Sequence, residues 1–153
     1  MTWPVSNSQH TVNHPFGEPR DYDGDGVYDD RHEGLDIYAR TGDTILPALP
    51  GTVVHASDKR RSDGQPSAYG WHVIVSHEGD YYETWYCHLE SLSVGVGDTV
   101  GVGSSLGPAG TSGNSTGIHL HFNVRKRGYI SGPGYVLPDV VDPLPLLEGI
   151  TSP

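Results

Sequence analysis

The sequence predicts a mostly β domain built around a small antiparallel sheet. Its 153 residues include 21 Gly and 12 Pro, too many helix-breaking residues for a helical bundle. Three Trp and nine Tyr supply enough large side chains for a packed core, which argues against a disordered chain. Cys87 is the single cysteine, so the core must form without an internal disulfide, and a chain of this length can do so.

Apolar residues come in short runs separated by turn residues, and these runs have the β-branched and aromatic content of strands. We expect strands over residues 35–38, 51–55, 71–77, 81–88, 100–102 and 118–124. Gly, Ser and Thr dominate residues 95–117, which predicts tight hairpins and loops. Four prolines in residues 131–147 predict a C-terminal strap laid over the domain. Almost no helix is expected.

The predicted organisation is an irregular N-terminal leader over residues 1–12, one domain over residues 13–147 and a tail over residues 148–153. No run approaches the ~20 apolar residues that span a bilayer, so no transmembrane segment is expected. The first residues lack both a basic segment and an apolar segment, and no signal peptide is visible in this chain.

The charge balance bears on the possible partners. Nineteen acidic residues against nine basic ones give a formal net charge of −10. Phosphate binding needs clustered Lys and Arg, and the only tight basic groups are residues 59–61 and 125–127. We therefore expect no nucleic-acid partner.

Two histidines share one face of the strand expected over residues 118–124. Strand alternation places His119, His121 and Asn123 together, opposite the apolar residues of the same run. The two imidazoles would then lie roughly 7 Å apart along the strand, a spacing that suits two groups converging on one reaction centre. The alternative is a solvated polar face that happens to carry two histidines.

His32 and Asp36 form a second candidate pair. Gly34 and the following Ile37 disfavour a helix, and in a straight strand the pair would lie ~13 Å apart. The two side chains converge only if the chain bends between them, and Gly34 permits such a bend. Together with one histidine of the His119/His121 pair they would supply the three protein ligands of a catalytic zinc ion, and the spacing leaves open which histidine binds. A chance surface pair is the alternative.

The strand expected over residues 81–88 ends in Cys87 and His88. Alternation places Thr84, Tyr86 and His88 on one face and Cys87 on the other, which argues against a nucleophilic Cys–His dyad. Cys87 is interpreted as a small buried hydrophobic residue beside Trp85. His88 ends an otherwise apolar strand and is free to face a site.

Several motifs occur in an order that resembles the lysostaphin-type zinc endopeptidases, the M23 or LytM-like family, over residues 12–147. The motifs are Pro15-Phe16-Gly17, His32-x-Gly34-Leu35-Asp36-Ile37, Gly51-Thr52-Val53-Val54, Trp85-Tyr86-Cys87-His88-Leu89, Gly97-Asp98-x-Val100 and the run from Gly110 to Phe122 that contains His119 and His121. The resemblance implies a small antiparallel β-sheet domain with a substrate groove, of the lysostaphin/LytM-like (duplicated-hybrid-motif) type. It also implies hydrolysis of stem or cross-bridge peptides of bacterial peptidoglycan.

Carried over by position, the resemblance implies that His32, Asp36 and His121 bind one zinc ion. His88 and His119 would be the catalytic pair that flanks the attacking water. A monomer that is secreted, periplasmic or associated with the cell wall is expected. Two other readings stay open: a non-catalytic wall-binding or hydrolase-activator module of the same fold, and a histidine phosphocarrier, which has no use for Asp36 as a ligand.

Residues 21–30 depart from this resemblance because they resemble the first part of a calcium-binding loop. Its pattern assigns possible calcium ligands at positions one, three, five, seven and nine to Asp21, Asp23, Asp25, the Val27 carbonyl and Asp29. Position twelve is His32, which the zinc interpretation already uses, so Asp30 or Glu33 would have to complete the loop. A solvated acidic turn is the alternative. Our hypothesis is that calcium rigidifies this loop and thereby positions His32.

Overall fold

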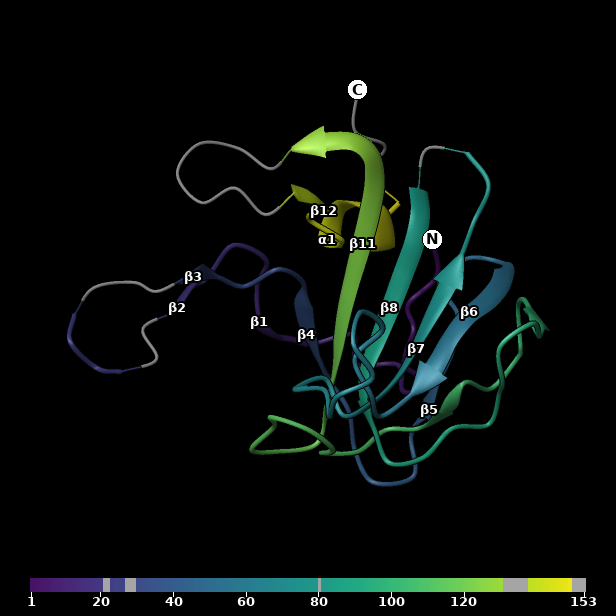
Figure 1. Cartoon of the computed structure of the whole chain (residues 1–153), viewed down its shortest axis with the longest axis horizontal. Coiled ribbons are helices and arrows are strands. Elements are labelled where there is room, and N and C mark those ends of the chain that lie inside the picture. Colours follow the sequence, from purple (N-terminus) through teal and green to yellow (C-terminus); the bar gives the residue numbers. More distant parts are fainter. Residues whose placement is uncertain (21–22, 27–29, 80, 131–137, 150–153) are drawn as a thin grey trace.

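The computed structural model describes residues 1–20, 23–26, 30–79, 81–130 and 138–149, and it is built on one antiparallel sheet (Figure 1). Along the sheet the strand order is β1-β4-β11-β8-β7-β6-β9, and β12 also pairs with β11. These strands are β1 (Val12–His14), β4 (Leu35–Tyr38), β6 (Gly51–Ser57), β7 (Trp71–Ser76), β8 (Tyr81–Leu89), β9 (Thr99–Val100), β11 (His119–Ile130) and β12 (Pro138–Val141).

Two smaller sheets and one helix complete the described structure. The small sheets pair β2 (Pro19–Arg20) with β3 (Asp30–Arg31) and β5 (Thr44–Ile45) with β10 (Gly107–Pro108). Helix α1 (Leu144–Leu147) has four residues, so the expectation of a mostly β chain with almost no helix is confirmed. No helix in the described ranges is long and apolar enough to cross a membrane.

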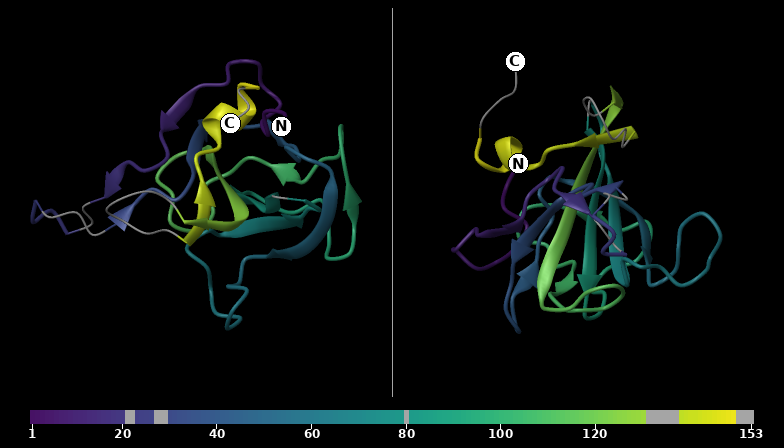
Figure 2. Two further views of the ribbon diagram at one scale, coloured as in Figure 1. Left: turned by 90° about the horizontal axis from the view of Figure 1, so that it is seen from above. Right: turned by 90° about the vertical axis from the view of Figure 1, so that its left-hand side faces the viewer.

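The ends of the chain differ somewhat from the simple leader and strap expected. Residues 1–11 carry no strand in the part of the chain described here, yet Val5 is only 3% exposed and pairs with Ile45 as an isolated bridge. The expected C-terminal strap contains β12 and α1, while residues 131–137 lie outside the described residues. The Met1 amino group lies 3.5 Å from the Leu146 carbonyl, and Figure 2 shows α1 beside the N-terminus.

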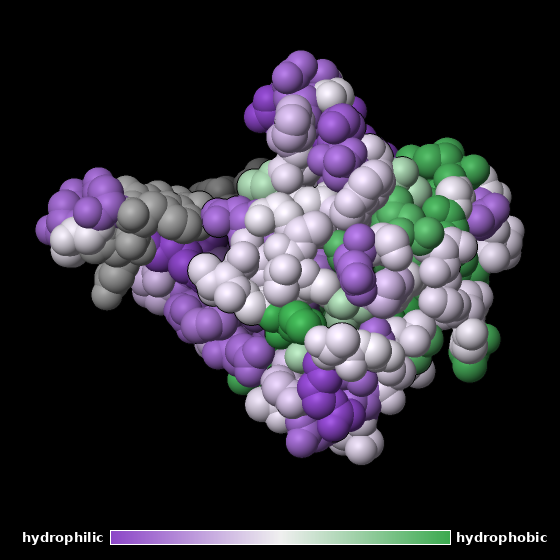
Figure 3. Space-filling view, turned by 90° about the horizontal axis from the view of Figure 1, so that it is seen from below, coloured by the Kyte–Doolittle hydropathy of each residue, from purple (hydrophilic) through white to green (hydrophobic). Residues whose placement is uncertain are grey.

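One face of the sheet forms the hydrophobic core. Leu120, Phe122 and Val124 of β11 are fully buried, and Leu35 and Ile37 of the adjacent β4 are buried with them. This is the alternation predicted for residues 118–124. Seen from below, most of the molecular surface is hydrophilic or neutral, and hydrophobic residues gather toward one side (Figure 3).

Strand register determines which residues of the other face meet. β11 lies between β4 and β8, with His121 opposite Asp36 on one side and opposite Cys87 on the other. Because β8 and β11 run antiparallel, the end of β8 lies beside the start of β11. His88, near the end of β8, therefore comes close to His119, the first residue of β11.

A chain of buried hydrogen bonds ties the sheet to the segment before β6. The Ala48 N–H donates to the Tyr86 hydroxyl over 2.9 Å, and the hydroxyl lies 2.8 Å from Thr84 Oγ1. Thr84 Oγ1 lies 2.8 Å from His77 Nε2, while His77 Nδ1–H donates to the Pro50 carbonyl over 2.6 Å. Each of the two hydroxyls can accept one hydrogen bond and donate the next, so every polar group in this series of hydrogen bonds has a partner. Burial raises the pKa of Tyr86 to about 12, and the hydroxyl stays protonated.

We predict that Tyr86→Phe lowers the free energy of unfolding by about 1–3 kcal/mol, because it leaves the Ala48 N–H and the Thr84 hydroxyl buried with one partner fewer. Urea unfolding of the variant and of the wild type measures the change. Tyr38→Phe is the matched control, since the half-buried Tyr38 hydroxyl makes no hydrogen bond to the described residues. Equal losses in the two variants would contradict the prediction.

Candidate metal centre

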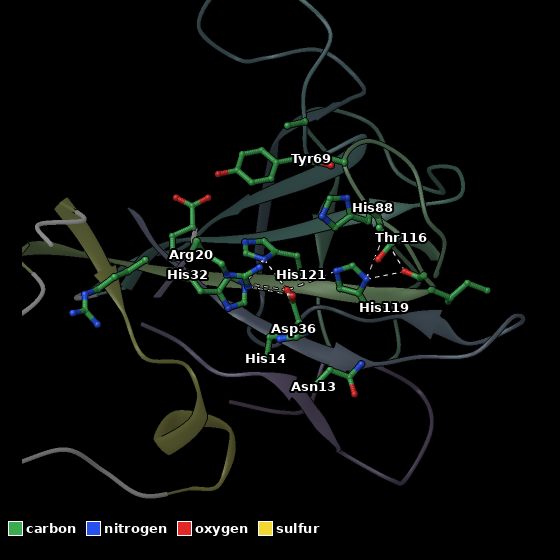
Figure 4. Close-up of a pocket in the computed structure, with 17 residues that line it drawn as sticks. Asn13, His14, Arg20, His32, Asp36, Tyr69, His88, Thr116, His119 and His121 are labelled. Atoms are coloured by element: carbon green, nitrogen blue, oxygen red, sulfur yellow. Dashed lines mark hydrogen bonds and ion pairs between the residues drawn. The ribbon is translucent and has the colours of Figure 1, made fainter. Parts of the chain in front are cut away.

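A cleft of about 680 Å³ is lined by residues of β4, β8 and β11 and of the loops before β4, β7 and β11 (Figure 4). Its lining includes all five site residues expected from the sequence: His32, Asp36, His88, His119 and His121. These residues come from three strands and from the loop before β4, so their meeting is a property of the fold and not of local sequence.

Asp36 is the centre of a compact cluster. Its Oδ1 lies 3.1 Å from His32 Nε2 and 2.9 Å from His121 Nδ1, and these two nitrogens are 3.1 Å apart. Each of the three side chains is at least nine-tenths buried, and they form a group of metal-binding type within the described residues.

The chemistry of this donor set fits a zinc ion. The carbonyl of Pro15 lies 2.9 Å from His32 Nδ1, and a carbonyl accepts only, so Nδ1 carries the hydrogen and Nε2 of the neutral ring has a lone pair. Facing a carboxylate oxygen 3.1 Å away, that lone pair needs a cation shared with it, which is either a proton on Nε2 or a metal ion between the two atoms. Two imidazoles and one carboxylate are typical zinc ligands, and donors about 2.0–2.2 Å from one tetrahedral ion lie roughly 3.3 Å apart.

Gly34 allows the cluster to form. A Cβ built at this position would lie 2.5 Å from the Phe122 carbonyl oxygen and 2.9 Å from the Asn123 Cβ. The backbone of residue 34 therefore packs directly against β11, which brings His32 and Asp36 to the same point. The expected convergence of His32 and Asp36 is present, and glycine is needed at position 34 for this close approach, since its φ is not positive.

The turn at residues 15–18 fixes His32 from the other side. The His32 N–H donates to the Glu18 carbonyl over 2.9 Å, and the Gly17 N–H donates to the His32 carbonyl over 2.8 Å. With the bond from Nδ1 to Pro15, three hydrogen bonds hold this residue, which belongs to no strand. Pro15 and Gly17 of the Pro15-Phe16-Gly17 motif thus hold His32 in place by hydrogen bonds.

His88 and His119 form a second pair beside the cluster. Their ring centroids are 5.0 Å apart, and His119 Nε2 lies 3.7 Å from Asp36 Oδ1. His88 Nδ1–H donates to the Ser112 carbonyl over 2.7 Å, and His119 Nδ1–H donates to the Gly117 carbonyl over 2.8 Å. In each neutral ring the remaining nitrogen, Nε2, is an acceptor.

His88 lies in β8, and its side chain reaches the cleft because its backbone departs from regular strand geometry. Alternation correctly predicts Thr84 and Tyr86 on the buried face, where both are fully buried. His88 has a φ of 67°, a left-handed conformation that is strained for a residue with a Cβ and turns its side chain off that face. Cys87 is fully buried, as predicted, and burial raises the pKa of its thiol well above the ordinary value.

Burial and local contacts set the charges in the cleft. Burial raises the pKa of Asp36, but its contacts with His121 and His32 outweigh burial and hold that pKa well below its usual range. Burial lowers the pKa of His88 to about 4, against the opposing effect of its bond to the Ser112 carbonyl. At neutral pH Asp36 is ionised and His88 is neutral.

Three further residues at this site were not predicted. Arg20 Nη2 lies 3.8 Å from Asp36 Oδ2, Tyr69 stacks on His121 with centroids 5.8 Å apart, and Asn123 Nδ2 lies 3.4 Å from His121 Nε2. Asn123 had a signal in the sequence, because alternation places it on the face of the two histidines. No local pattern marks Arg20 or Tyr69, since Arg20 reaches the cleft from β2 and Tyr69 from the turn before β7.

The proposed calcium loop is only partly described. Asp21, Val27 and Asp29 lie outside the described residues. Asp23 and Asp25 are exposed, and the Asp25 N–H donates to Asp23 Oδ1 over 3.2 Å. This contact is a local turn bond, and the calcium hypothesis stays a prediction.

The fold and parts of the sequence match known proteins. The catalytic domain of lysostaphin from Staphylococcus simulans superposes with a TM-score of 0.69 at 26% identity, over 91% of this chain and 92% of that one. The catalytic domain of the prophage-encoded M23 protein EnpA from Enterococcus faecalis gives 0.63 at 29% identity, over 90% and 91%. The expected lysostaphin-like antiparallel fold is therefore confirmed.

Curated relatives include two kinds of protein. The glycyl-glycine endopeptidase ALE-1 of Staphylococcus capitis is 28% identical over 80% of this chain and 31% of its own length. The murein hydrolase activator NlpD of Escherichia coli is 29% identical over 74% of this chain and 28% of its own length. The chain thus spans about a third of the length of these relatives. Residues 30–133 match the model of peptidase family M23, and the chain belongs to that family.

Proposed function

We propose that this chain is a zinc-dependent endopeptidase that hydrolyses peptide bonds in the stem or cross-bridge peptides of peptidoglycan. The observation that best supports the proposal is that one cleft holds both a buried three-donor cluster and a second pair of histidines. A catalytic zinc takes three protein ligands and keeps one position open, and the cluster has this composition.

His32, Asp36 and His121 would hold the zinc ion through Nε2, Oδ1 and Nδ1. When bound, zinc polarises the scissile carbonyl and lowers the pKa of water toward ~7. Asp36 would cancel one of the ion's two positive charges, and the cluster would keep a net positive charge suited to a carbonyl oxygen.

His88 and His119 would move the proton. As water adds to the carbonyl carbon, Nε2 of one ring accepts a proton from it, and the same proton then passes to the leaving amine as the C–N bond breaks. The low pKa of His88 makes its imidazolium a good proton donor to the amine and its neutral ring a weaker base toward water, which suits His88 to the delivery step. The Nδ1 bonds to the Ser112 and Gly117 carbonyls hold both rings in place.

A non-catalytic activator is the alternative, and the relation to NlpD supports keeping it. An activator needs no metal ligands, whereas this chain retains a full donor set and both flanking histidines. A phosphocarrier would leave the buried Asp36 without a role. The endopeptidase is therefore favoured, with a location outside the cytoplasm or in the cell wall and a monomeric state as parts of the same proposal.

Two variants test the proposal together. Wild-type protein is expected to bind about one zinc per chain and to release peptide fragments from purified walls, identified by mass. His121→Ala should lose zinc and hydrolysis together, because it removes a ligand. His88→Ala should keep zinc and lose about 10²–10⁴-fold in rate, because it removes a proton carrier.

His10→Ala is the control, since His10 is exposed and does not line the cleft. A metal-free His121→Ala protein that still cleaves walls would contradict the ligand assignment. Zinc-loaded wild type that releases no fragments but stimulates a separate wall hydrolase would establish the activator role instead.

The stability of the metal-free protein should fall with acid. His72, His77 and His88 all have pKa values lowered by burial, to about 4 for His88. In the unfolded chain they titrate near ~6.5, so their contribution is complete above that pH. As pH falls from ~6.5 to 4 the unfolded chain binds protons that the folded chain does not, and the free energy of unfolding decreases.

Urea unfolding at pH 7.5 and at pH 4.5, with chelator present, measures this loss. His88→Gln should show a smaller pH-dependent loss than the wild type, because one of the responsible groups is gone. An equal loss in the variant would show that His88 titrates normally in the folded state.

We also infer that residues 21–30 bind a structural calcium ion. Five carboxylates in ten residues repel one another unless a cation lies among them. Millimolar calcium, but not magnesium, should raise the thermal midpoint of the zinc-loaded protein, since binding to the folded state alone stabilises it. The double variant Asp23→Asn, Asp25→Asn should abolish the shift. Identical midpoints with and without calcium in the wild type would remove the hypothesis.

A further inference from the structure

Each member of the metal cluster has a second partner outside it. His32 Nδ1 is fixed by the Pro15 carbonyl, Asp36 Oδ2 faces Arg20, and His121 Nε2 faces the Asn123 amide. Such partners orient a ligand and determine which nitrogen of an imidazole carries the hydrogen. In the contact between His121 and Asn123, the donor and acceptor roles differ from those that zinc binding through His121 Nδ1 would require.

The mismatch follows from the roles of the two ring nitrogens. To bind zinc through Nδ1, a neutral His121 must carry its hydrogen on Nε2. Nε2–H would then point at Asn123 Nδ2, 3.4 Å away, which is itself a donor. Meanwhile Asn123 Oδ1 is buried and has no hydrogen-bond partner among the described residues. One acceptor is unused next to a histidine that needs one.

We propose that Asn123 is a positioning residue of the zinc site: in the metal-bound protein its amide is turned by 180°, and Oδ1 accepts a hydrogen bond from His121 Nε2–H. This inference rests on the proposed zinc ligation by His121. The rotation breaks no hydrogen bond to Oδ1, because Oδ1 accepts none from the described residues. It exchanges two groups of almost equal size, so the side chain needs no new space.

The opposite orientation of the amide fits the other tautomer of His121. With Nδ2 donating to Nε2, the hydrogen of His121 lies on Nδ1, which is 2.9 Å from the ionised Asp36 Oδ1 and can donate to it. An amide can serve both tautomers of its neighbour, as donor in one and as acceptor in the other. Neither a carboxylate nor an apolar side chain can do so.

Packing restricts the Asn123 side chain to the two orientations of its terminal amide. The residue is fully buried on β11, opposite Trp85 of β8, and the backbone at Gly34 packs against it: a Cβ at residue 34 would lie only 2.9 Å from the Asn123 Cβ. The side chain cannot swing into solvent. Rotation of its terminal amide is the adjustment left to it.

Two near-isosteric variants separate the possibilities. Asn123→Asp keeps an acceptor and removes the donor, whereas Asn123→Leu removes both. Zinc affinity is measured by competition with a chromophoric chelator, without substrate. We expect Asn123→Leu to bind zinc about 10–100-fold more weakly than the wild type and Asn123→Asp to bind at least as tightly. Weakening of both variants by the same factor would overturn the proposal.

A readout on the wild type does not depend on any variant folding. Long-range ¹H–¹⁵N correlation spectra of the zinc-loaded wild type should show His121 with its hydrogen on Nε2. The same spectra of zinc-loaded Asn123→Asp should show the same His121 tautomer. A His121 that keeps its hydrogen on Nδ1 in the presence of one zinc equivalent would contradict the proposal. Because neither measurement uses hydrolysis, a protein that binds zinc this way but cleaves no walls would refute the proposed activity and leave the role of Asn123 intact.

Discussion

The register between β4 and β11 is the constraint on which the site depends. It places Asp36 directly opposite His121, and both side chains leave the sheet on the face away from the core. A slip of one residue would turn Ile37 or Leu35 into the cleft and bury Asp36 in the hydrophobic layer. Burial of Leu35 and Ile37 against Leu120 and Phe122 opposes such a slip, so the hydrophobic core fixes the geometry of a polar site.

This geometry concentrates buried polar groups that are unfavourable without a cation. An ionised Asp36 lies within 3.1 Å of two imidazole nitrogens, and one of them has only a lone pair to offer. Burying a carboxylate is costly unless opposite charge or hydrogen bonds compensate for it, and Arg20 Nη2 remains 3.8 Å away. The cluster is therefore a compact, buried donor set of the kind that could hold a metal ion.

The sequence predicts the residue positions that follow from regular strand geometry, and it does not predict the positions that depend on irregular backbone or on distant segments. Alternation predicts the shared face of His119, His121 and Asn123, because that face follows from strand geometry alone. It fails at His88, whose left-handed φ is imposed by contacts from elsewhere, including the hydrogen bond from its N–H to the Tyr69 carbonyl. Arg20 likewise enters from a distant segment, and no local pattern marks it.

The four histidines of the described site differ in what anchors them. His32, His88 and His119 each donate Nδ1–H to a backbone carbonyl, so their tautomers are set by the fold and present Nε2 to the cleft. His121 presents Nδ1 instead, and its other nitrogen faces a side-chain amide. A backbone carbonyl can only accept, but an amide can accept or donate. Of the four, His121 is thus the residue whose partner suits either tautomer, while backbone carbonyls fix the other three rings.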